Sequence, residues 1–357
     1  MSEIDWDSLT FSLTETDWMY MVKCKLGDAW TPGKIMPYGP FEIYPAAGVL
    51  NYGQGIFEGM KAHKTTKDRV VIFRAEKNAR RFQSGADRLG MPPVPESIFL
   101  DAVEQVVAAN KKWIPPSGKG ALYIRPLLIG TGPIMGVAPA PEYTFLVYVT
   151  PVGPYFKGGL SCINLIITDE YHRAAPGGSG GVKAIGNYAP GMMPSKNAKK
   201  NGFAEVIYLD AEDHKYIEEV GAANFFCVKD NIIYTPELTG TILPGITRDS
   251  VIQLARHQGY EVIEEKVSAG FAMDADEAFC CGTAAVISPI GSITHGDKKK
   301  TYSNGDIGPI TQQLYNLLSG IHSEKVEDQF GWLHEVDLDL NIVFLSLSSA
   351  IILFLGL

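Results

Sequence analysis

The sequence lacks the cysteine and histidine patterns that hold metal ions or build disulfide frameworks. Its five cysteines include no CxxC pair, and its seven histidines show neither HExxH nor HxH spacing. Scattered cysteines in odd number are typical of reduced thiols, so we expect no metal site. Positive charge is also scarce, because 31 Lys and Arg stand against 40 Asp and Glu, a formal net charge of −9. Such a molecule repels phosphate backbones and anionic membranes, which excludes nucleic acid as an expected partner.

The first residues, MSEIDWD, lack the arginines of a transit peptide and the apolar segment of a signal peptide. We therefore expect a cytoplasmic protein, with the chloroplast as the alternative if a transit peptide has been removed. The uncharged apolar run at residues 341–357 is shorter than the roughly 20 residues that span a bilayer. The GWLHEV that precedes it is typical of the end of a domain. We interpret residues 337–357 as an atypical apolar tail and expect no membrane partner.

Length and composition predict a globular protein with two domains. At roughly 150 residues per domain, 357 residues favour two cores, and the composition is 46% hydrophobic and 20% charged. Strand-like and helical segments alternate without strict βαβ order, which favours an α+β fold. We expect an N-terminal α+β domain over 1–152, a Pro- and Gly-rich linker over 153–160 and a C-terminal α+β domain over 161–336. The expected strands are 19–25, 70–73, 121–128, 143–150, 162–168, 204–209, 224–228 and 232–234, and the expected helices are 78–89, 98–113, 195–201, 247–257 and 310–321.

A glycine-rich loop, residues 177–181, leads to a lysine in apolar surroundings. The segment is not a phosphate-binding P-loop, because Val182 precedes Lys183 and Ala184 follows it, where that motif needs Gly before and Ser or Thr after the lysine. A solvated surface lysine is one interpretation. The other is a buried amine with a lowered pKa, which suits covalent bonding to a carbonyl compound.

Three further segments each allow a structural and a functional interpretation. Glu218 and Glu219 precede an apolar run, so they form either a solvated strand end or a buried carboxylate that needs a cationic partner. The LPGITR segment, residues 243–248, precedes a helix. It is either an ordinary helix start or a site where the first N–H groups of the helix bind an anion. The CGTAA segment, residues 281–285, is either a packed turn or a source of backbone donors and a hydroxyl.

Taken together, these segments resemble the class IV (fold type IV) pyridoxal-phosphate aminotransferases. The resemblance rests on EVGAANFF at 219–226, IYT at 233–235 and LPGITR at 243–248, in content and in spacing. YGQGIFEGMKA at 52–62, YIRP at 123–126 and GVKAIGNY at 181–188 resemble the branched-chain-amino-acid aminotransferases, with residues 122–133 most similar to plant members. The resemblance covers about residues 15–336 and implies a two-domain fold with the cofactor between the domains.

The resemblance implies roles for single residues. Lys183 would bind pyridoxal 5'-phosphate covalently and shuttle the proton from the substrate α-carbon, while Glu219 would face the pyridine nitrogen and Tyr188 the ring oxygen. The cofactor's phosphate would be held by Arg81, Ile246, Thr247 and Thr283. The substrate would be bound by Tyr52, Phe57, Tyr123 and Arg125 around its side chain, and by Thr283 and Ala284 at its α-carboxylate.

The implied activity is transfer of an amino group between Leu, Ile or Val and 2-oxoglutarate in a ping-pong cycle, by a homodimer. An aromatic pocket favours branched aliphatic side chains, while Arg125 would accept the second carboxylate of glutamate. Within the class, the YxxGxFEG and YIRP segments argue against a D-amino-acid aminotransferase and an aminodeoxychorismate lyase. The alternatives are a transaminase for methionine-derived oxo acids and a non-catalytic protein on the same fold, and Lys183, Glu219 and Arg81 disfavour the latter. The redox CxxC of some animal members is absent, because residues 285–288 read AVIS.

Overall fold

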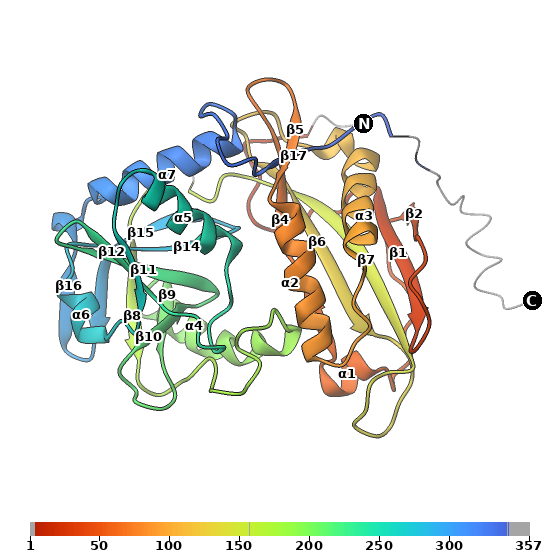
Figure 1. Ribbon diagram of the computed structural model, residues 1–357, viewed down its shortest axis with the longest axis horizontal. Coiled ribbons are helices and arrows are strands. Elements are labelled where there is room, and N and C mark those ends of the chain that lie inside the picture. Colours follow the sequence, from red (N-terminus) through yellow and green to blue (C-terminus); the bar gives the residue numbers. More distant parts are fainter. Residues whose placement is uncertain (1–3, 157, 341, 343–357) are drawn as a thin grey trace, which may run out of the picture. The chain divides into compact units, whose positions relative to one another are not determined.

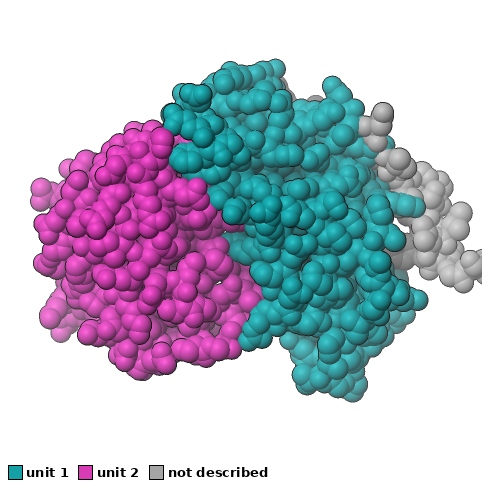
Figure 2. All heavy atoms as spheres, in the orientation of Figure 1, with its two compact units in different colours: residues 1–154, 322–357 teal, residues 155–321 magenta. Residues whose placement is uncertain are grey.

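The structure is a computed structural model that describes residues 4–156, 158–340 and 342 (Figure 1). The residues of the apolar tail from 343 onward lie outside the described part. Two compact units divide the described chain, and Figure 2 shows them in different colours. Unit 1 comprises the residues up to Pro154 and those from His322 onward, and unit 2 comprises Tyr155–Ile321.

The unit boundaries differ from the expected domains at one end. The chain enters unit 2 after Pro154, inside the expected linker 153–160, but it leaves after Ile321 instead of after residue 336. The physical reason is strand pairing, because Leu333 and Glu335 lie opposite Phe73 and Val71 in the sheet of unit 1. The expected second domain of 161–336 therefore loses residues 322–336 to unit 1.

Unit 1 is built on an antiparallel sheet with strand order β17-β5-β4-β6-β7-β1-β2, and β3 pairs with β6. The central strands β6 and β7 are buried along most of their length, which explains why their sequences are nearly continuous apolar runs. The strands are β1 (Trp18–Lys25), β2 (Lys34–Pro37), β3 (Gly55–Phe57), β4 (Met60–Lys64), β5 (Val70–Phe73), β6 (Ala121–Gly130), β7 (Glu142–Val152) and β17 (Leu333–Glu335).

Two helices of unit 1, α2 (Ala75–Arg88) and α3 (Glu96–Ala109), pack against each other and contact strands of this sheet. The buried residues of α2 recur at helical spacing and include Ala79, Phe82 and Ala86. Phe82 lies 5.6 Å from Phe145 of β7 between ring centroids, so this helix face covers the sheet. The shorter helices are α1 (Gly48–Tyr52) and the 3₁₀ turn η1 (Lys111–Trp113).

Unit 2 is a closed arrangement of strands. The strand order is β10-β9-β8-β15-β14-β11. Because β10 also pairs with β11, the sheet closes on itself around an apolar core. Strands β12 and β13 extend the sheet beyond β11, and β16 pairs with β15. Successive side chains of β11 point to opposite faces of the sheet. Phe225 and Cys227 belong to this core, while the ring centroid of Phe226 lies 4.9 Å from that of Phe279 in a stacked arrangement. The strands are β8 (Ile163–Thr168), β9 (Glu205–Leu209), β10 (Ile217–Val220), β11 (Ala223–Lys229), β12 (Ile232–Pro236), β13 (Val262–Glu265), β14 (Glu277–Gly282), β15 (Val286–His295) and β16 (Lys298–Thr301).

The longest helix that begins in unit 2, α7, starts against a buried carboxylate. Glu277 of β14 accepts hydrogen bonds from the backbone N–H groups of Ile310 and Thr311 at 3.1 and 2.9 Å, and from the Thr311 hydroxyl at 2.7 Å. Donors at a helix start have no partner within the helix, so Glu277 satisfies two of them. The helices are α4 (Met192–Lys200), α5 (Ile246–His257), α6 (Ala269–Met273) and α7 (Pro309–His322), and the 3₁₀ turns are η2 (Ile185–Asn187), η3 (Ala189–Gly191) and η4 (Ser303–Gly305).

The expected α+β class is confirmed, and the expected strands and helices all have counterparts. The largest shift concerns the helix expected over 98–113, because α3 ends at Ala109 and a 3₁₀ turn follows. None of the helices within the described ranges has the length and apolarity that a bilayer crossing requires.

Candidate functional site

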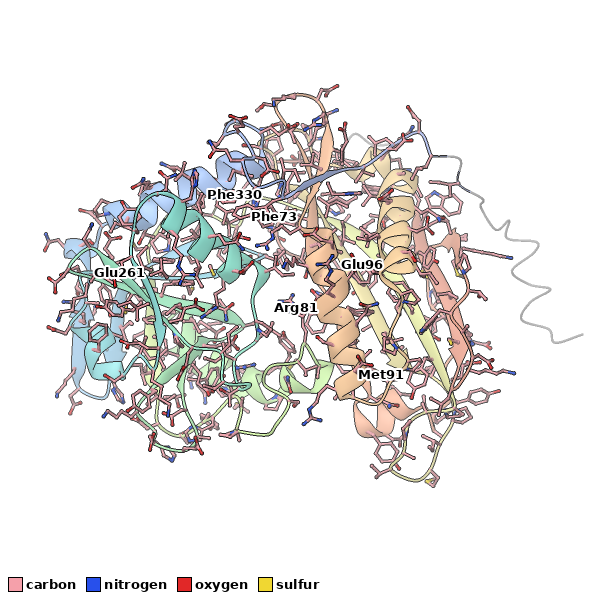
Figure 3. The ribbon with its side chains drawn as sticks, viewed as in Figure 1. Phe73, Arg81, Met91, Glu96, Glu261 and Phe330 are labelled. Atoms are coloured by element: carbon pink, nitrogen blue, oxygen red, sulfur yellow. The ribbon has the colours of Figure 1, made fainter. Side chains whose placement is uncertain are left out.

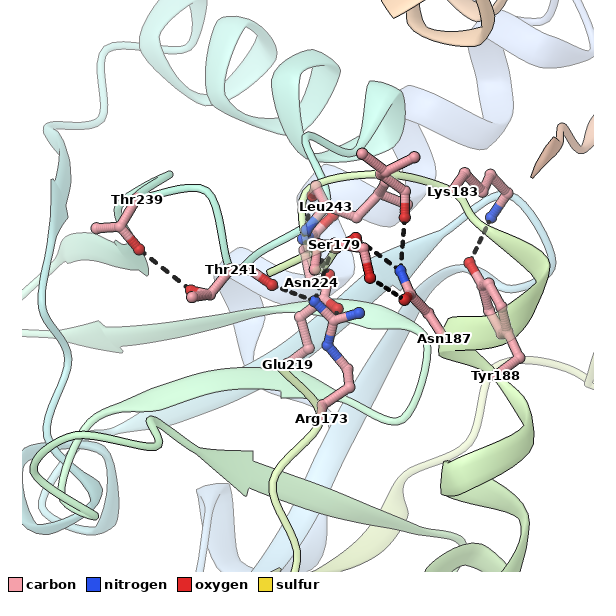
Figure 4. A network of polar contacts seen from close by, with 12 residues as sticks. Arg173, Ser179, Lys183, Asn187, Tyr188, Glu219, Asn224, Thr239, Thr241 and Leu243 are labelled. Carbon is pink, nitrogen blue, oxygen red and sulfur yellow. Dashed lines mark hydrogen bonds and ion pairs between the residues drawn. The ribbon is translucent and has the colours of Figure 1, made fainter. Parts of the chain in front are cut away.

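Lys183 lies directly after the glycine-rich loop, and its amine donates a hydrogen bond to the Tyr188 hydroxyl at 3.0 Å (Figure 4). Asn187 holds the glycine-rich loop that precedes Lys183. The Asn187 amide donates to the carbonyls of Ser179 and Val182 at 2.7 and 2.8 Å, and its Oδ1 accepts from the Ser179 hydroxyl at 2.7 Å. The structure therefore brings together Lys183 and Tyr188, two of the predicted residues, on a backbone that Asn187 holds in place.

The loop also requires glycine where it approaches the segment 239–243. The N–H of Gly181 donates to the carbonyl of Gly240 at 2.8 Å. At Gly180, a Cβ atom would come within 2.2 Å of the Thr241 carbonyl oxygen. A larger residue there would push the glycine-rich loop away from the segment 239–243.

Glu219 lies on β10 and is 2% exposed, with donors on both carboxylate oxygens. Its Oε1 accepts from Asn224 Nδ2 at 3.1 Å and from the Leu243 N–H at 3.3 Å, and its Oε2 lies 2.6 Å from Arg173 Nε (Figure 4). Burial raises the pKa of Glu219 to about 7, against the opposing field of Arg173. A carboxylate offers about four lone-pair positions, so one further donor fits.

Arg173 and Asn224 are site residues that the sequence analysis did not identify. One terminal nitrogen of Arg173 donates to the carbonyl of Gly180 at 3.1 Å and to that of Thr241. Asn224 donates to the carbonyl of Leu243 at 3.0 Å as well as to Glu219. The only signal in the sequence was position, because Arg173 shortly precedes the glycine-rich loop and Asn224 lies inside the EVGAANFF segment.

Glu218 is also buried, so the interpretation of the acidic pair as a solvated strand end is wrong. It accepts a hydrogen bond from the Thr241 side chain, and burial raises its pKa. Glu218 lines a cavity together with Asp210 and Tyr216, whereas Glu219 bonds to Asn224 and Leu243. The neighbouring carboxylates thus have separate hydrogen-bond partners.

The predicted phosphate-binding residues of unit 2 lie at a helix start and in a turn. Gly245 precedes the 12-residue helix α5, and no side chain caps the start of this helix. The N–H groups of Ile246 and Thr247 at the helix start are therefore suited to binding an anion. Thr283 and Ala284 form the turn between β14 and β15. Pairing of Asn224 with Cys281 places this turn beside the end of the hairpin that carries Glu219.

In unit 1, Arg81 forms a two-bonded ion pair with Glu58. Its Nε and a terminal nitrogen each donate to a different Glu58 oxygen at 2.7 Å. Glu58 is fully buried and also accepts from Asn78 at 2.8 Å. Figure 3 shows Arg81 on α2, and the sequence analysis did not identify Glu58 as its partner.

Among the four predicted side-chain-binding residues of unit 1, Arg125 contacts both Phe57 and Tyr123. The Arg125 guanidinium lies 4.7 Å from the Phe57 ring centroid and 5.3 Å from that of Tyr123, and it donates to the Tyr123 hydroxyl at 3.2 Å. Gly59 allows this packing, because a Cβ there would come within 2.2 Å of the same hydroxyl. Tyr52 lies elsewhere in the unit, where its hydroxyl donates to the carbonyl of Met135.

Comparison with known proteins assigns the family. The model of the class IV aminotransferases matches residues 55–293. A chloroplastic branched-chain-amino-acid aminotransferase 3 of Arabidopsis thaliana is 50% identical over 333 residues, which is 93% of this chain and 81% of the relative. A methionine aminotransferase of the same plant is 47% identical over 336 residues, which is 94% of each chain.

Solved structures agree with the sequence relatives. The branched-chain amino acid aminotransferase of Escherichia coli superposes with a TM-score of 0.79 at 29% identity, covering 90% of this chain and 100% of the other. That of Thermobaculum terrenum, in its pyridoxal-phosphate form, gives 0.75 at 25% identity, covering 90% and 99%. The resemblance seen in the sequence is thereby confirmed, and the chain belongs to the branched-chain-amino-acid aminotransferase family of the class IV, fold type IV aminotransferases.

Proposed function

We propose that this protein transfers the amino group between Leu, Ile or Val and 2-oxoglutarate with pyridoxal 5'-phosphate as cofactor. The observation that carries the proposal is the polar network of unit 2, in which Lys183, Tyr188 and the buried Glu219 are held by Arg173, Asn187 and Asn224. A non-catalytic protein on this fold would have no need of a buried carboxylate with a raised pKa beside a positioned lysine. The class to which the chain belongs uses this cofactor.

The residues fit the cofactor at its two charged ends. Glu219 has three donors and room for a fourth, which a protonated ring nitrogen would supply. The start of α5 offers N–H groups that no side chain caps, which suits a phosphate. When bound, the cofactor supplies an electron sink for negative charge at the substrate α-carbon. Thr283 and Arg81 would add a hydroxyl and a guanidinium to the phosphate.

Lys183 would hold the cofactor covalently and then move a proton. Once released from the cofactor, its Nζ would take the proton from the substrate α-carbon and return it to the carbon on the other side of the substrate nitrogen, and the Tyr188 hydroxyl would orient that amine through their hydrogen bond. Glu219 stays ionised to keep the ring nitrogen protonated, with Arg173 opposing the effect of burial on its pKa. Asn187 keeps the lysine backbone in place during both half-reactions.

Substrate selection would rest on the aromatic group of unit 1. Phe57 and Tyr123 offer ring surface to a branched aliphatic side chain, and Arg125 between them would pair with the second carboxylate of glutamate. The α-carboxylate would bind the backbone N–H groups of Thr283 and Ala284, whereas Tyr52, which bonds to Met135, lies apart from this aromatic group. Methionine-derived oxo acids are the second candidate, since one relative is named a methionine aminotransferase.

The protein would act as a homodimer. Supporting this, helix α1 and the loop between β6 and β7 expose large apolar residues, with Leu50 at 60%, Met135 at 85% and Val137 at 87% exposure. The two segments are joined by the hydrogen bond from Tyr52 to the carbonyl of Met135 and by that from the N–H of Ile134 to the carbonyl of Ala46, which precedes the helix. Exposed apolar surface of this kind is typical of a subunit interface. Light scattering after size-exclusion chromatography measures the expected doubled mass.

The relatives bear on the compartment. The names of several relatives at 49–51% identity carry the word chloroplastic, which supports the chloroplast, the alternative to the cytoplasm. Import of the full natural translation product into isolated chloroplasts, with protection from added protease, decides between the two.

One experiment tests the cofactor and the lysine together. The purified protein incubated with pyridoxal phosphate should absorb visible light, and borohydride should fix the cofactor to Lys183, as peptide mass mapping would show. Initial rates with 2-oxoglutarate then rank Leu, Ile, Val and Met. Labelling of a different lysine would overturn the site, and a kcat/KM for Met above those for all three branched-chain substrates would favour the second candidate.

A further inference from the structure

Glu58 is a fully buried carboxylate to which the proposed transamination gives no role. It lies between β3 and β4, and its two oxygens accept four hydrogen bonds from described residues. Oε1 accepts from Arg81 Nε at 2.7 Å. Oε2 accepts from a terminal nitrogen of Arg81 at 2.7 Å, from Asn78 Nδ2 at 2.8 Å and from the Gly59 N–H at 3.3 Å. A carboxylate offers about four lone-pair positions, so these bonds occupy Glu58.

Stability alone does not account for this buried charge. Taking two charges out of water is costly, and replacing a buried ion pair by apolar side chains of similar volume is often neutral or stabilising. Asn78 adds to the cost, because it is 3% exposed and asparagine is a poor helix former inside α2. The buried polar group is better explained by the side chain that it orients, which is Arg81.

The ion pair fixes the plane of the Arg81 guanidinium. Nε and one terminal nitrogen bond to different oxygens of the same carboxylate, and pairing of this kind sets orientation as well as distance. Because the guanidinium is planar, its second terminal nitrogen then points away from Glu58. Asn78 lies on α2 three residues before Arg81, on the same face, and holds Oε2 from that side.

Glu58 is itself attached to the sheet of unit 1. Its backbone N–H donates to the carbonyl of Pro126 at 2.9 Å, and the preceding residue, Phe57, lies opposite Leu127 of β6. The sheet therefore sets the orientation of Arg81, in addition to the helix that carries it.

We propose that Glu58 is a positioning residue for cofactor binding, which orients the Arg81 guanidinium so that its second terminal nitrogen donates to the cofactor's phosphate. This inference rests on the proposed function, in which Arg81 binds that phosphate. Glu58 acts through Arg81, because its own oxygens are occupied. An arginine that is already held in the required orientation loses less conformational entropy when the phosphate binds.

Pyridoxal, which has the ring and the carbonyl but no phosphate, separates this role from a merely structural one. Equilibrium dialysis on the full chain gives the Kd of pyridoxal and that of pyridoxal 5'-phosphate, and their ratio measures what the phosphate contributes. Glu58→Gln keeps the size of the side chain, but its amide nitrogen faces an N–H of Arg81, so the two-bonded pairing is lost. The ratio should fall roughly tenfold. General loosening of the protein would weaken both ligands equally.

The effect should disappear when Arg81 is absent. Arg81→Gln should itself lower the ratio of the two dissociation constants. Adding Glu58→Gln to that variant should change the ratio by less than about twofold, because both substitutions remove the same interaction.

Glu324→Gln is the matched control, because it breaks a similar ion pair in the same unit. The Glu324 side chain is 6% exposed, and its two oxygens accept from Nε and a terminal nitrogen of Arg69. Neither residue belongs to the predicted site, so the ratio should change by less than about twofold.

Circular dichroism verifies the fold of each variant. Should Glu58→Gln not fold, Asn78→Ala carries the test, since it removes one donor to Glu58 and should lower the ratio about threefold. An unchanged or raised ratio in the folded variant, an equal fall in Glu324→Gln, or an undiminished effect of Glu58→Gln in the absence of Arg81 overturns the proposal alone. A wild type that binds no cofactor, or an Arg81→Gln variant with an unchanged ratio, overturns the proposed role of Arg81 and this inference with it.

Discussion

Arg173 holds the Glu219 carboxylate at 2.6 Å and, with the same guanidinium, binds the carbonyls of Gly180 and Thr241. One side chain thus connects the buried acid to the glycine-rich loop before Lys183 and to the segment 239–243. Its positive charge lowers the pKa of Glu219 against the larger effect of burial.

Replacing Arg173 by Gln should therefore move the acidic limb of the pH–rate profile to higher pH. Without the guanidinium, the pKa of Glu219 rises above about 7, and a smaller fraction is ionised at neutral pH. Breaking a buried ion pair also costs about 3–5 kcal/mol of unfolding free energy. Arg173→Lys keeps the charge, so its acidic limb should lie nearer to that of the wild type. An unshifted limb in Arg173→Gln would contradict this role.

Lys183→Ala should abolish transamination and leave the fold nearly intact. The residue's role is covalent and its bond to Tyr188 is a single hydrogen bond, so we expect a loss of more than about a hundredfold in kcat. Single-turnover rates and urea unfolding measure the two effects. Turnover within about tenfold of the wild type would show that another residue carries the chemistry.

Glu219→Gln should reduce kcat more than Glu218→Gln. The amide oxygen introduced by Glu219→Gln would accept the same bonds from Asn224 and Leu243, but the neutral amide could not balance the charge of a protonated ring nitrogen. Glu218 bonds to Thr241 instead, so its neutralisation leaves those bonds in place. The pair is compared by steady-state kinetics at saturating cofactor, and a larger loss in the Glu218 variant would mean that the two roles are exchanged.

The cofactor-free protein should become less stable as pH rises from about 4.5 to about 7. Burial raises the pKa of Glu219 to about 7, so the folded state retains a proton that the unfolded state releases above its ordinary pKa. More protons bound in the folded state make the unfolding free energy fall with rising pH. Glu219→Gln should flatten this slope relative to the wild type, as urea unfolding at several pH values would measure; an unchanged slope speaks against a raised pKa.

Glu277→Ala should destabilise unit 2 by about 2–4 kcal/mol, because the N–H groups of Ile310 and Thr311 lose their acceptor in a buried place. Gly308→Ala tests the same contact from the other side, since a Cβ there would come within 2.1 Å of Glu277 Oε2. The exposed Glu261 serves as control, with an expected change below about 0.5 kcal/mol for Glu261→Gln. Urea unfolding measures all three.

The local sequence pattern was enough to predict the buried central strands and the neighbourhood of Lys183. The continuous apolar sequences of β6 and β7 match buried central strands, and the lysine beside a glycine-rich loop has its predicted neighbour Tyr188. Arg173 and Asn224 could not be predicted in the same way, because a polar residue in a loop looks solvated until a buried carboxylate is placed beside it.

The remaining features could not be predicted because they depend on contacts between residues that are distant in the sequence. Residues 323–336 follow α7 directly, and their pairing with β5 places them in unit 1. The cavity at Glu218 depends on segments 210–212 and 236–242, which no periodicity connects. The bond between Glu58 and Arg81 likewise joins residues from before and within α2.

The return of the chain to β5 gives the protein an order of assembly during its synthesis. Unit 2 is one uninterrupted stretch, Tyr155–Ile321, whose strands have all been synthesised before β17 is made. Unit 1 is begun first and finished last, and until then β5 is the open edge of its sheet. An unpaired edge invites pairing with other chains, so nascent unit 1 is the part most in need of chaperones.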